Sequence, residues 1–366
     1  MSTIATISKR LSSINFGQDV PWGSTSFLSQ QNLNKLPRAH LRRHLLAREE
    51  NGNGKRSQLI QCLQTSLENE QEEKRRLEEE QEKIHVQTAQ LEEKGAVYCV
   101  GSNHRGQLGL GDLQHRNIFT VIAASRGLKI NQVSSKNDLV FGVSESHHVY
   151  CWGSAGMGPM GIESREKRSQ FESLQLVNSL EEEDIICVVV GLDHACSISE
   201  TAVYSWGSGY SGCLGNGTLD VQMLPDMVSF SKDCRIQRID TGEMHCCALS
   251  STGDVFTWGH EANGRLGGGD FREMVSIPRI VNLTERIRMI ACGSEHTMAA
   301  SESKVYSWGD NDGARLGHGD VEDRCEPCEI IGLSGLGIIA ISCGTWHSAC
   351  IAAAPPMQGS GWLYTW

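Results

Sequence analysis

The sequence lacks the long apolar segments that a membrane-spanning protein needs. It contains no run of 18 consecutive apolar residues. Its first residues, MSTIATISKRLSS, hold no apolar core of the length found in a secretory signal peptide. These absences predict a soluble, intracellular protein with no membrane partner, whose 14 cysteines are reduced thiols.

The motifs of the common enzyme classes are also missing. G-x-x-x-x-G-K-[ST], H-E-x-x-H and G-x-S-x-G do not occur, which argues against a phosphate-binding loop, a zinc protease helix and a nucleophile elbow. The lone C-x-x-C, Cys325 to Cys328, offers two of the four ligands of a structural zinc site. Successive residues of the segment His245-Cys246-Cys247 alternate faces on the expected strand, so they cannot all reach one metal. We expect no catalytic residues, no metal and no cofactor.

Glycine, by contrast, is abundant at 39 of 366 residues, and much of it belongs to a repeat. Segments resembling V-Y-x-W-G begin at Val97, Val149, Val203, Val255, Val305 and Leu363, which are 50 to 58 residues apart. A second marker, G-x-x-H, recurs every 51 residues, in the pairs Gly191 and His194, Gly242 and His245, Gly293 and His296, and Gly344 and His347. Two markers in register at one period predict a repeat architecture.

Each repeat reads as four short strands. The copy around Val255 has apolar segments that begin at Ile236, His245, Asp254 and Ser276, separated by turns that contain glycine. Four strands in about 50 residues predict a mainly β fold made of propeller blades. We expect Trp206, Trp258 and Trp308 to pack between blades. The repeated histidines are spread around the ring, so we expect buried, hydrogen-bonded struts rather than metal ligands.

These repeats resemble the regulator of chromosome condensation family over residues 97–366. The turn residues that carry the resemblance most clearly are Asn103, Gly106, Gln107, Leu108, Gly109 and Gly111. The resemblance implies a β-propeller of seven blades. About five periods are present, which predicts either a fragment truncated at its C-terminus or an open, incomplete ring. Family members include a chromatin-bound exchange factor for the GTPase Ran, scaffolds, parts of ubiquitin ligases and a plant UV-B receptor. Only Trp346 among the four residues preceding the repeated histidines is a tryptophan, which argues against light sensing.

The N-terminal part has a different character. Residues 1–32 are polar and without periodicity, which predicts a disordered lead-in. Residues 33–67 predict a helix, a glycine-containing loop and a second helix, and residues 1–67 carry nine Lys/Arg against three Asp/Glu. This segment resembles the SAP module, a DNA-binding helix-loop-helix. The resemblance places DNA contacts at Arg38, Arg42, Arg43, Gly54, Lys55 and Arg56. The alternative is a basic hairpin whose charges only face solvent.

Residues 68–94 form a charged run that joins this module to the repeats at residues 95–366. The run holds ten Asp/Glu and five Lys/Arg, with i,i+4 pairs such as Glu72 with Arg76. It predicts a single helix acting as a spacer. Leu77, Ile84 and Leu91 recur every seven residues, so weak coiled-coil pairing is the alternative.

The sequence as a whole predicts a nuclear, non-enzymatic protein associated with chromatin. The basic module would bind DNA, while the propeller, in a segment with a net charge of −12, would bind a protein partner through its loops. Two alternatives stay open. One is a guanine-nucleotide exchange factor for a Ran-like GTPase, and the other is a cytoplasmic interaction scaffold such as a ubiquitin-ligase adaptor.

Overall fold

The computed structural model describes residues 72, 74–76, 95–155, 160–162, 170–231, 234–269, 274–353 and 361–366. Two compact units divide the chain, Met1–Glu92 and Glu93–Trp366. In the first unit the described residues are helical, and Arg76 Nη2 lies 3.8 Å from Glu72 Oε1. The predicted helix-loop-helix of residues 33–67, with all six of its predicted DNA contacts, lies outside the described residues.

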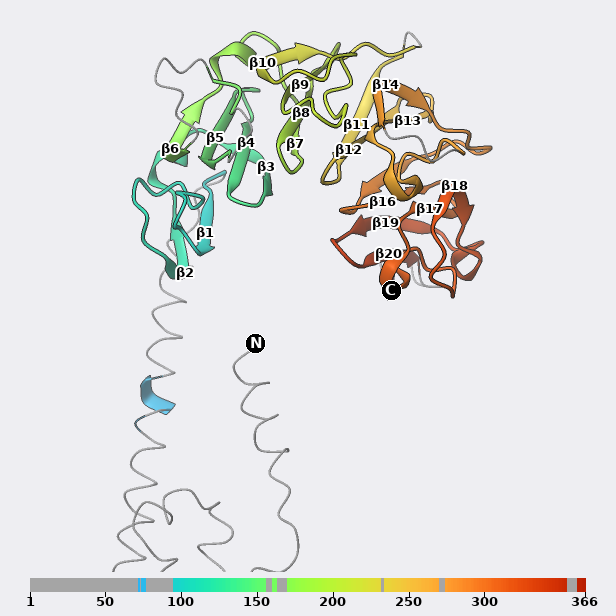
Figure 1. Cartoon of the computed structure of the whole chain (residues 1–366). Coiled ribbons are helices and arrows are strands. Elements are labelled where there is room, and N and C mark those ends of the chain that lie inside the picture. Colours follow the sequence, from blue (N-terminus) through green and yellow to red (C-terminus); the bar gives the residue numbers. More distant parts are fainter. Residues whose placement is uncertain are drawn as a thin grey trace, which may run out of the picture. The chain divides into compact units, whose positions relative to one another are not determined.

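The second unit consists of antiparallel sheets that follow one another along the chain (Figure 1). Its described part holds six sheets, and four of them have four strands. The four-stranded sheets contain β3 (Ile130–Lys136), β4 (Leu139–Ser144), β5 (Val149–Ser154) and β6 (Gln170–Leu176); β7 (Cys187–Val190), β8 (His194–Ile198), β9 (Val203–Gly207) and β10 (Gln222–Met227); β11 (Ile236–Thr241), β12 (His245–Ser250), β13 (Val255–His260) and β14 (Met274–Ile280); and β15 (Met289–Cys292), β16 (His296–Ala300), β17 (Val305–Gly309) and β18 (Arg324–Glu329).

The remaining two sheets are smaller. The first pairs β1 (Tyr98–Gly101) with β2 (Arg116–Val121), and the last contains β19 (Ile338–Cys343), β20 (Ser348–Ala353) and β21 (Gly361–Thr365). Each copy of the V-Y-x-W-G segment forms a strand of a different sheet. The expectation of about five blades therefore corresponds to four complete sheets and two partial ones in the described part of the chain.

Burial falls from the middle of each sheet toward its last strand. In the third four-stranded sheet, all residues of β12 and five of the six residues of β13 are buried. β14 is mostly half-exposed or exposed, and Ile277 on it has 59% of its surface exposed. A strand with buried residues on both faces must have another layer on each side. The sheets therefore pack face to face.

The core lies between successive sheets. The first strands of neighbouring sheets, β3, β7, β11, β15 and β19, contact one another in that order. In Figure 1 the sheets accordingly succeed one another along an arc. Phe141 of one sheet meets the indole of Trp206 of the next edge to face, with ring centroids 5.6 Å apart. Sheets that stack radially in this way form a β-propeller, which confirms the predicted fold class.

In the described part of this unit, short 3₁₀ helices supply the other regular structure. They are η2 (Ala123–Ser125), η3 (Asn178–Leu180), η4 (Ala262–Gly264), η5 (Asp312–Ala314) and η6 (Ile331–Leu333). Among the described residues, no helix has the length and apolar character needed to cross a membrane.

Candidate functional site

The G-x-x-H turns connect the first two strands of successive sheets, and their spacing has a steric cause. The imidazole of His194 folds back over Gly191, so that a Cβ added to Gly191 would lie 2.1 Å from His194 Cε1. The same clash would arise at Gly242 with His245, at 2.2 Å. Gly293 and Gly344 stand in the same relation to His296 and His347. Only glycine leaves room for the ring at this position.

The ring nitrogens reach the next sheet. His245 Nε2 lies 3.0 Å from Thr297 Oγ1, and His296 Nε2 lies 2.9 Å from Ser348 Oγ. Thr297 Oγ1 donates to the carbonyl oxygen of Arg265 at 2.9 Å. Since the hydroxyl proton is used there, the imidazole Nε2–H must donate to the hydroxyl oxygen. Burial, aided by the Arg315 charge, lowers the pKa of His296 to about 4, which keeps this ring neutral.

The repeated tryptophans pack against the glycine turn of the preceding sheet. Trp206, Trp258 and Trp308 are fully buried. A Cβ at Gly215 would lie 2.7 Å from Trp258 Nε1, and one at Gly267 would lie 2.8 Å from Trp308 Nε1. The tryptophan and histidine markers thus lie at the junctions between sheets, where they hold the surface loops in place.

Above the histidines, the G-x-x-H turns form a continuous surface that we name the turn row: residues 191–194, 242–245, 293–296 and 344–347. Backbone hydrogen bonds join the first three turns, from Leu192 N to Glu243 O at 3.0 Å and from Glu243 N to Ser294 O at 3.2 Å. The turn row is therefore fixed by the sheets beneath it and does not depend on a flexible loop.

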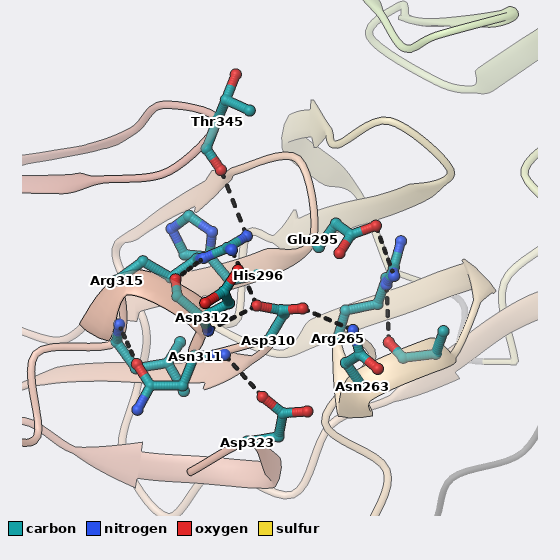
Figure 2. A network of polar contacts seen from close by, with 12 residues as sticks. Asn263, Arg265, Glu295, His296, Asp310, Asn311, Asp312, Arg315, Asp323 and Thr345 are labelled. Carbon is teal, nitrogen blue, oxygen red and sulfur yellow. Dashed lines mark hydrogen bonds and ion pairs between the residues drawn. The ribbon is translucent and has the colours of Figure 1, made fainter. Parts of the chain in front are cut away.

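A network of charges supports one end of the turn row (Figure 2). Arg265 Nη2 lies 3.3 Å from Glu295 Oε1, and Arg315 Nη2 lies 3.0 Å from Asp310 Oδ1. Asn263 Nδ2 donates to the other oxygen of Asp310 at 2.6 Å. The two arginine side chains are almost completely buried, so each is neutralised within the network. These side chains come from loops of one sheet and turns of the next.

Trp346 is the most prominent exposed residue of the turn row. Its ring lies over the Arg315 guanidinium, at 4.3 Å from centroid to Cζ, and 60% of its surface is exposed. Met244 occupies the equivalent place two turns earlier and is 37% exposed. Asp193 and Glu295 occupy the other two equivalent places and are half-exposed. The row thus combines fixed apolar and acidic side chains, which suits a protein partner.

Sequence reasoning identified the repeat markers but not the residues of this surface. Arg265 and Arg315 occupy the repeat position that holds Gln107 in the first repeat. This difference between copies is the sequence signal that could have pointed to the two arginines. Trp346 was visible as the one tryptophan preceding a repeated histidine. Neither signal shows that these side chains meet, because the arginines and Trp346 belong to different repeats.

Comparison with known proteins identifies the relatives of this chain. A family model described as RCC1-like domain matches residues 52–366. E3 ubiquitin-protein ligase HERC2 of Homo sapiens is 30% identical over 281 residues, which cover 74% of this chain and 6% of that protein. Ultraviolet-B receptor UVR8 of Arabidopsis thaliana is 31% identical over 274 residues, which cover 73% of this chain and 61% of the receptor. The chain thus spans less than two thirds of the length of either relative.

Among solved structures, Prp20p of Saccharomyces cerevisiae has the same fold. It superposes with a TM-score of 0.63 at 21% identity, covering 71% of this chain and 65% of that one. Prp20p itself is described as having binding properties to Gsp1p and histones.

Proposed function

The chain belongs to the RCC1-like domain family, and from that premise we propose that its propeller is a protein-interaction module rather than an enzyme. The turn row carries this proposal. It presents an exposed tryptophan held by a buried arginine, with acidic side chains at neighbouring turns. Exposed aromatic anchors in a fixed polar surround are typical of residues that contribute most to protein binding.

The chemistry of the row defines the partner. Asp193 and Glu243 place carboxylates in the turn that contains Met244 and in the turn before it, while the Glu295 carboxylate is paired with Arg265, and residues 95–366 carry a net charge of −12. A partner segment with Lys or Arg beside an apolar side chain complements this surface. The charges would speed association, and burial of the Trp346 ring would supply much of the affinity.

Replacement of Trp346 tests this assignment. The full chain, with an affinity tag, is used to capture partners, which are then purified and titrated against the wild type and Trp346→Ala. We expect the dissociation constant to rise about tenfold or more, equivalent to roughly 1.4 kcal/mol. Trp362→Ala is the matched control, because Trp362 is 62% exposed but lies on β21, outside the turn row. Equal affinities of all three proteins would contradict the assignment.

We further propose that the basic residues of the N-terminal part bind duplex DNA, which would give the protein a nuclear location on chromatin. Lys55 and Arg56 would neutralise phosphates, so binding should weaken steeply with salt. In the Lys55→Ala, Arg56→Ala double variant we expect the slope of log affinity against log salt to become shallower by about two. Lys9→Ala with Arg10→Ala removes the same charge from the lead-in and should leave the slope nearly unchanged. Identical slopes in both double variants would refute the site.

Exchange activity on a Ran-like GTPase is the alternative that the family resemblance suggests, and it makes a different prediction. An exchange factor accelerates release of bound nucleotide, whereas an interaction module or a ubiquitin-ligase adaptor binds without doing so. Release of a fluorescent guanine nucleotide from Ran, measured with and without the full chain at micromolar concentration, separates the two. Acceleration would replace the interaction-module proposal.

A further inference from the structure

One junction between sheets differs chemically from the others. At the junction of the second and third four-stranded sheets, His194 and Cys196 of β8 face Cys246 of β12. His194 Nε2 lies 3.2 Å from Cys246 Sγ, and Cys196 Sγ lies 3.7 Å from Cys246 Sγ. All three ligand atoms lie within 4.8 Å of one another, and all three residues are buried. We name these residues the thiol cluster.

The neighbouring junctions show what the cluster replaces. The residue that faces the histidine of the preceding sheet is Thr297 at one junction and Ser348 at the next, and each carries a hydroxyl. At this junction the same position holds Cys246. The residue two places after the histidine is Cys196 here and Cys247 in β12, whereas β16 has Met298 and β20 has Ala349. Among the described junctions, only this one has a thiol both at that position and at the position that faces the histidine. Simple hydrogen bonding needs one small polar group, so a pair of thiols beside a histidine requires another explanation.

We propose that His194, Cys196 and Cys246 supply three of the four ligands of one Zn²⁺ ion that links the two sheets, with a water molecule as the fourth. Thiolate and imidazole are preferred zinc ligands, at about 2.3 Å for sulfur and about 2.0 Å for nitrogen. Tetrahedral coordination at those lengths separates two sulfurs by about 3.8 Å and sulfur from nitrogen by about 3.5 Å. The sulfur–sulfur separation of 3.7 Å fits, and the sulfur–nitrogen separation of 3.2 Å must lengthen slightly. His194 Nε2 and Cys196 Sγ lie within 4.8 Å of each other, so this pair must close by at most about 1 Å.

Charge balance favours the same ion. Zinc binding releases one proton from each thiol, and the two thiolates then cancel the charge of Zn²⁺, so the buried site is neutral. The imidazole of His194 would bind as the neutral ring, which is the form that coordinates zinc. Its Nε2 lone pair would face the metal, with the proton on Nδ1. The carbonyl oxygen of Cys213, 3.4 Å from Cys246 Sγ, borders the cluster.

The ligands come from two adjacent strands of different sheets. No single strand could supply them, in agreement with the expectation that residues 245–247 cannot share a metal. His194 is also the last residue of its turn in the turn row. A zinc ion here would fix the spacing between two of those turns.

Elemental analysis of the full chain tests the proposal. Wild type and variants are purified in reductant, loaded with Zn²⁺ and dialysed against a weak chelator. We expect wild type to retain about one zinc more per chain than Cys246→Ser. Cys246→Ser restores the hydroxyl found at the other junctions, so it should fold, which circular dichroism checks. Cys247→Ala is the matched control, because it removes the next buried thiol, outside the cluster, and should keep the zinc.

A second measurement addresses the ligands directly. With Co²⁺ in place of zinc, thiolate ligands give charge-transfer absorption in the near ultraviolet, which should be present in wild type and Cys247→Ala and absent in Cys246→Ser. Because two protons leave on binding, affinity should fall about 100-fold per pH unit on acidification. Equal zinc content in wild type and Cys246→Ser would overturn the proposal. A second result would also overturn it. Intact mass would show a Cys196–Cys246 disulfide in protein purified without reductant, and the same protein would bind no zinc after the disulfide is reduced.

Discussion

At the scale of single residues, Ala314 stands out, because it occupies a backbone conformation that belongs to glycine in the equivalent loop. Its φ is +62°, and Gly264, at the same repeat position, has a φ of +80°. The left-handed region costs a residue with a Cβ roughly 1 kcal/mol. The loop sequence around residue 314 therefore carries a local strain that the loop around residue 264 avoids.

Replacing Ala314 by glycine should therefore stabilise the protein. We expect Ala314→Gly to raise the free energy of unfolding by up to about 1 kcal/mol, because relief of the left-handed strain exceeds the added entropy of the unfolded chain. The reciprocal variant Gly264→Ala should lower the free energy of unfolding by more than about 1 kcal/mol. Its Cβ would lie 2.5 Å from Cys325 Cα in addition to adopting the strained φ. Urea unfolding of both variants gives the two values, and destabilisation by Ala314→Gly would show that residue 314 carries no such strain.

At the scale of elements, each histidine strut connects one sheet to the next. The partners of His194, His245 and His296 lie 52 residues further along the chain, one repeat period plus one residue. The neutral rings of His245 and His296 donate their Nε2–H to a hydroxyl, so protonation would add a second, buried charge to each ring. The junctions between sheets should therefore weaken when the histidines are protonated.

This weakening gives a pH dependence with a definite sign. The pKa of His296 is about 4 in the folded protein and about 6.5 in the unfolded chain. The unfolded state binds the proton first as pH falls, so stability is complete above about pH 6.5 and is lost toward pH 4. At pH 5 the loss from this one ring is about 2 kcal/mol. Gln at position 296 can still donate to Ser348 but cannot be protonated.

Unfolding free energies of wild type and His296→Gln, measured from pH 7 to pH 5, test this directly. The variant should lose about 2 kcal/mol less than wild type over that range. His245→Gln should change the profile in the same direction, since burial also lowers the pKa of His245. Parallel profiles of wild type and His296→Gln would show that the ring does not titrate as the structure implies.

The repeat period made the strands of each sheet predictable from the sequence. Contacts between side chains of different repeats could not be predicted in this way. Two markers in register specified four-stranded units, because a strand that recurs with its turn can be recognised within one repeat. The pairing of Arg265 with Glu295, or of Arg315 with Trp346, joins side chains of different repeats. Nothing in a single copy encodes such a contact. Comparing the copies at one position, as with Cys246, Thr297 and Ser348, is the way to find it.

At the scale of the whole molecule, the chain divides into two units, and the basic residues 1–67 of the first contrast with the acidic residues 95–366 of the second. Residues 1–67 hold nine Lys/Arg against three Asp/Glu, while residues 95–366 carry a net charge of −12. Basic residues suit phosphates, and the acidic turn row suits a basic protein segment. Under the proposed function, one chain would hold DNA and a protein partner at the same time.

If each unit carries its own site, the two activities should separate genetically. Trp346→Ala should lower the affinity for the protein partner and leave the affinity for DNA unchanged. The Lys55→Ala, Arg56→Ala variant should lower the affinity for DNA and leave the affinity for the protein partner unchanged. In the combined triple variant, the free-energy changes for each ligand should add within about 0.5 kcal/mol, as they do for independent sites. Fluorescence anisotropy with labelled duplex DNA and with the labelled partner gives all the constants. A larger coupling would mean that the units communicate, because one ligand would then change the affinity for the other by the same factor in both directions.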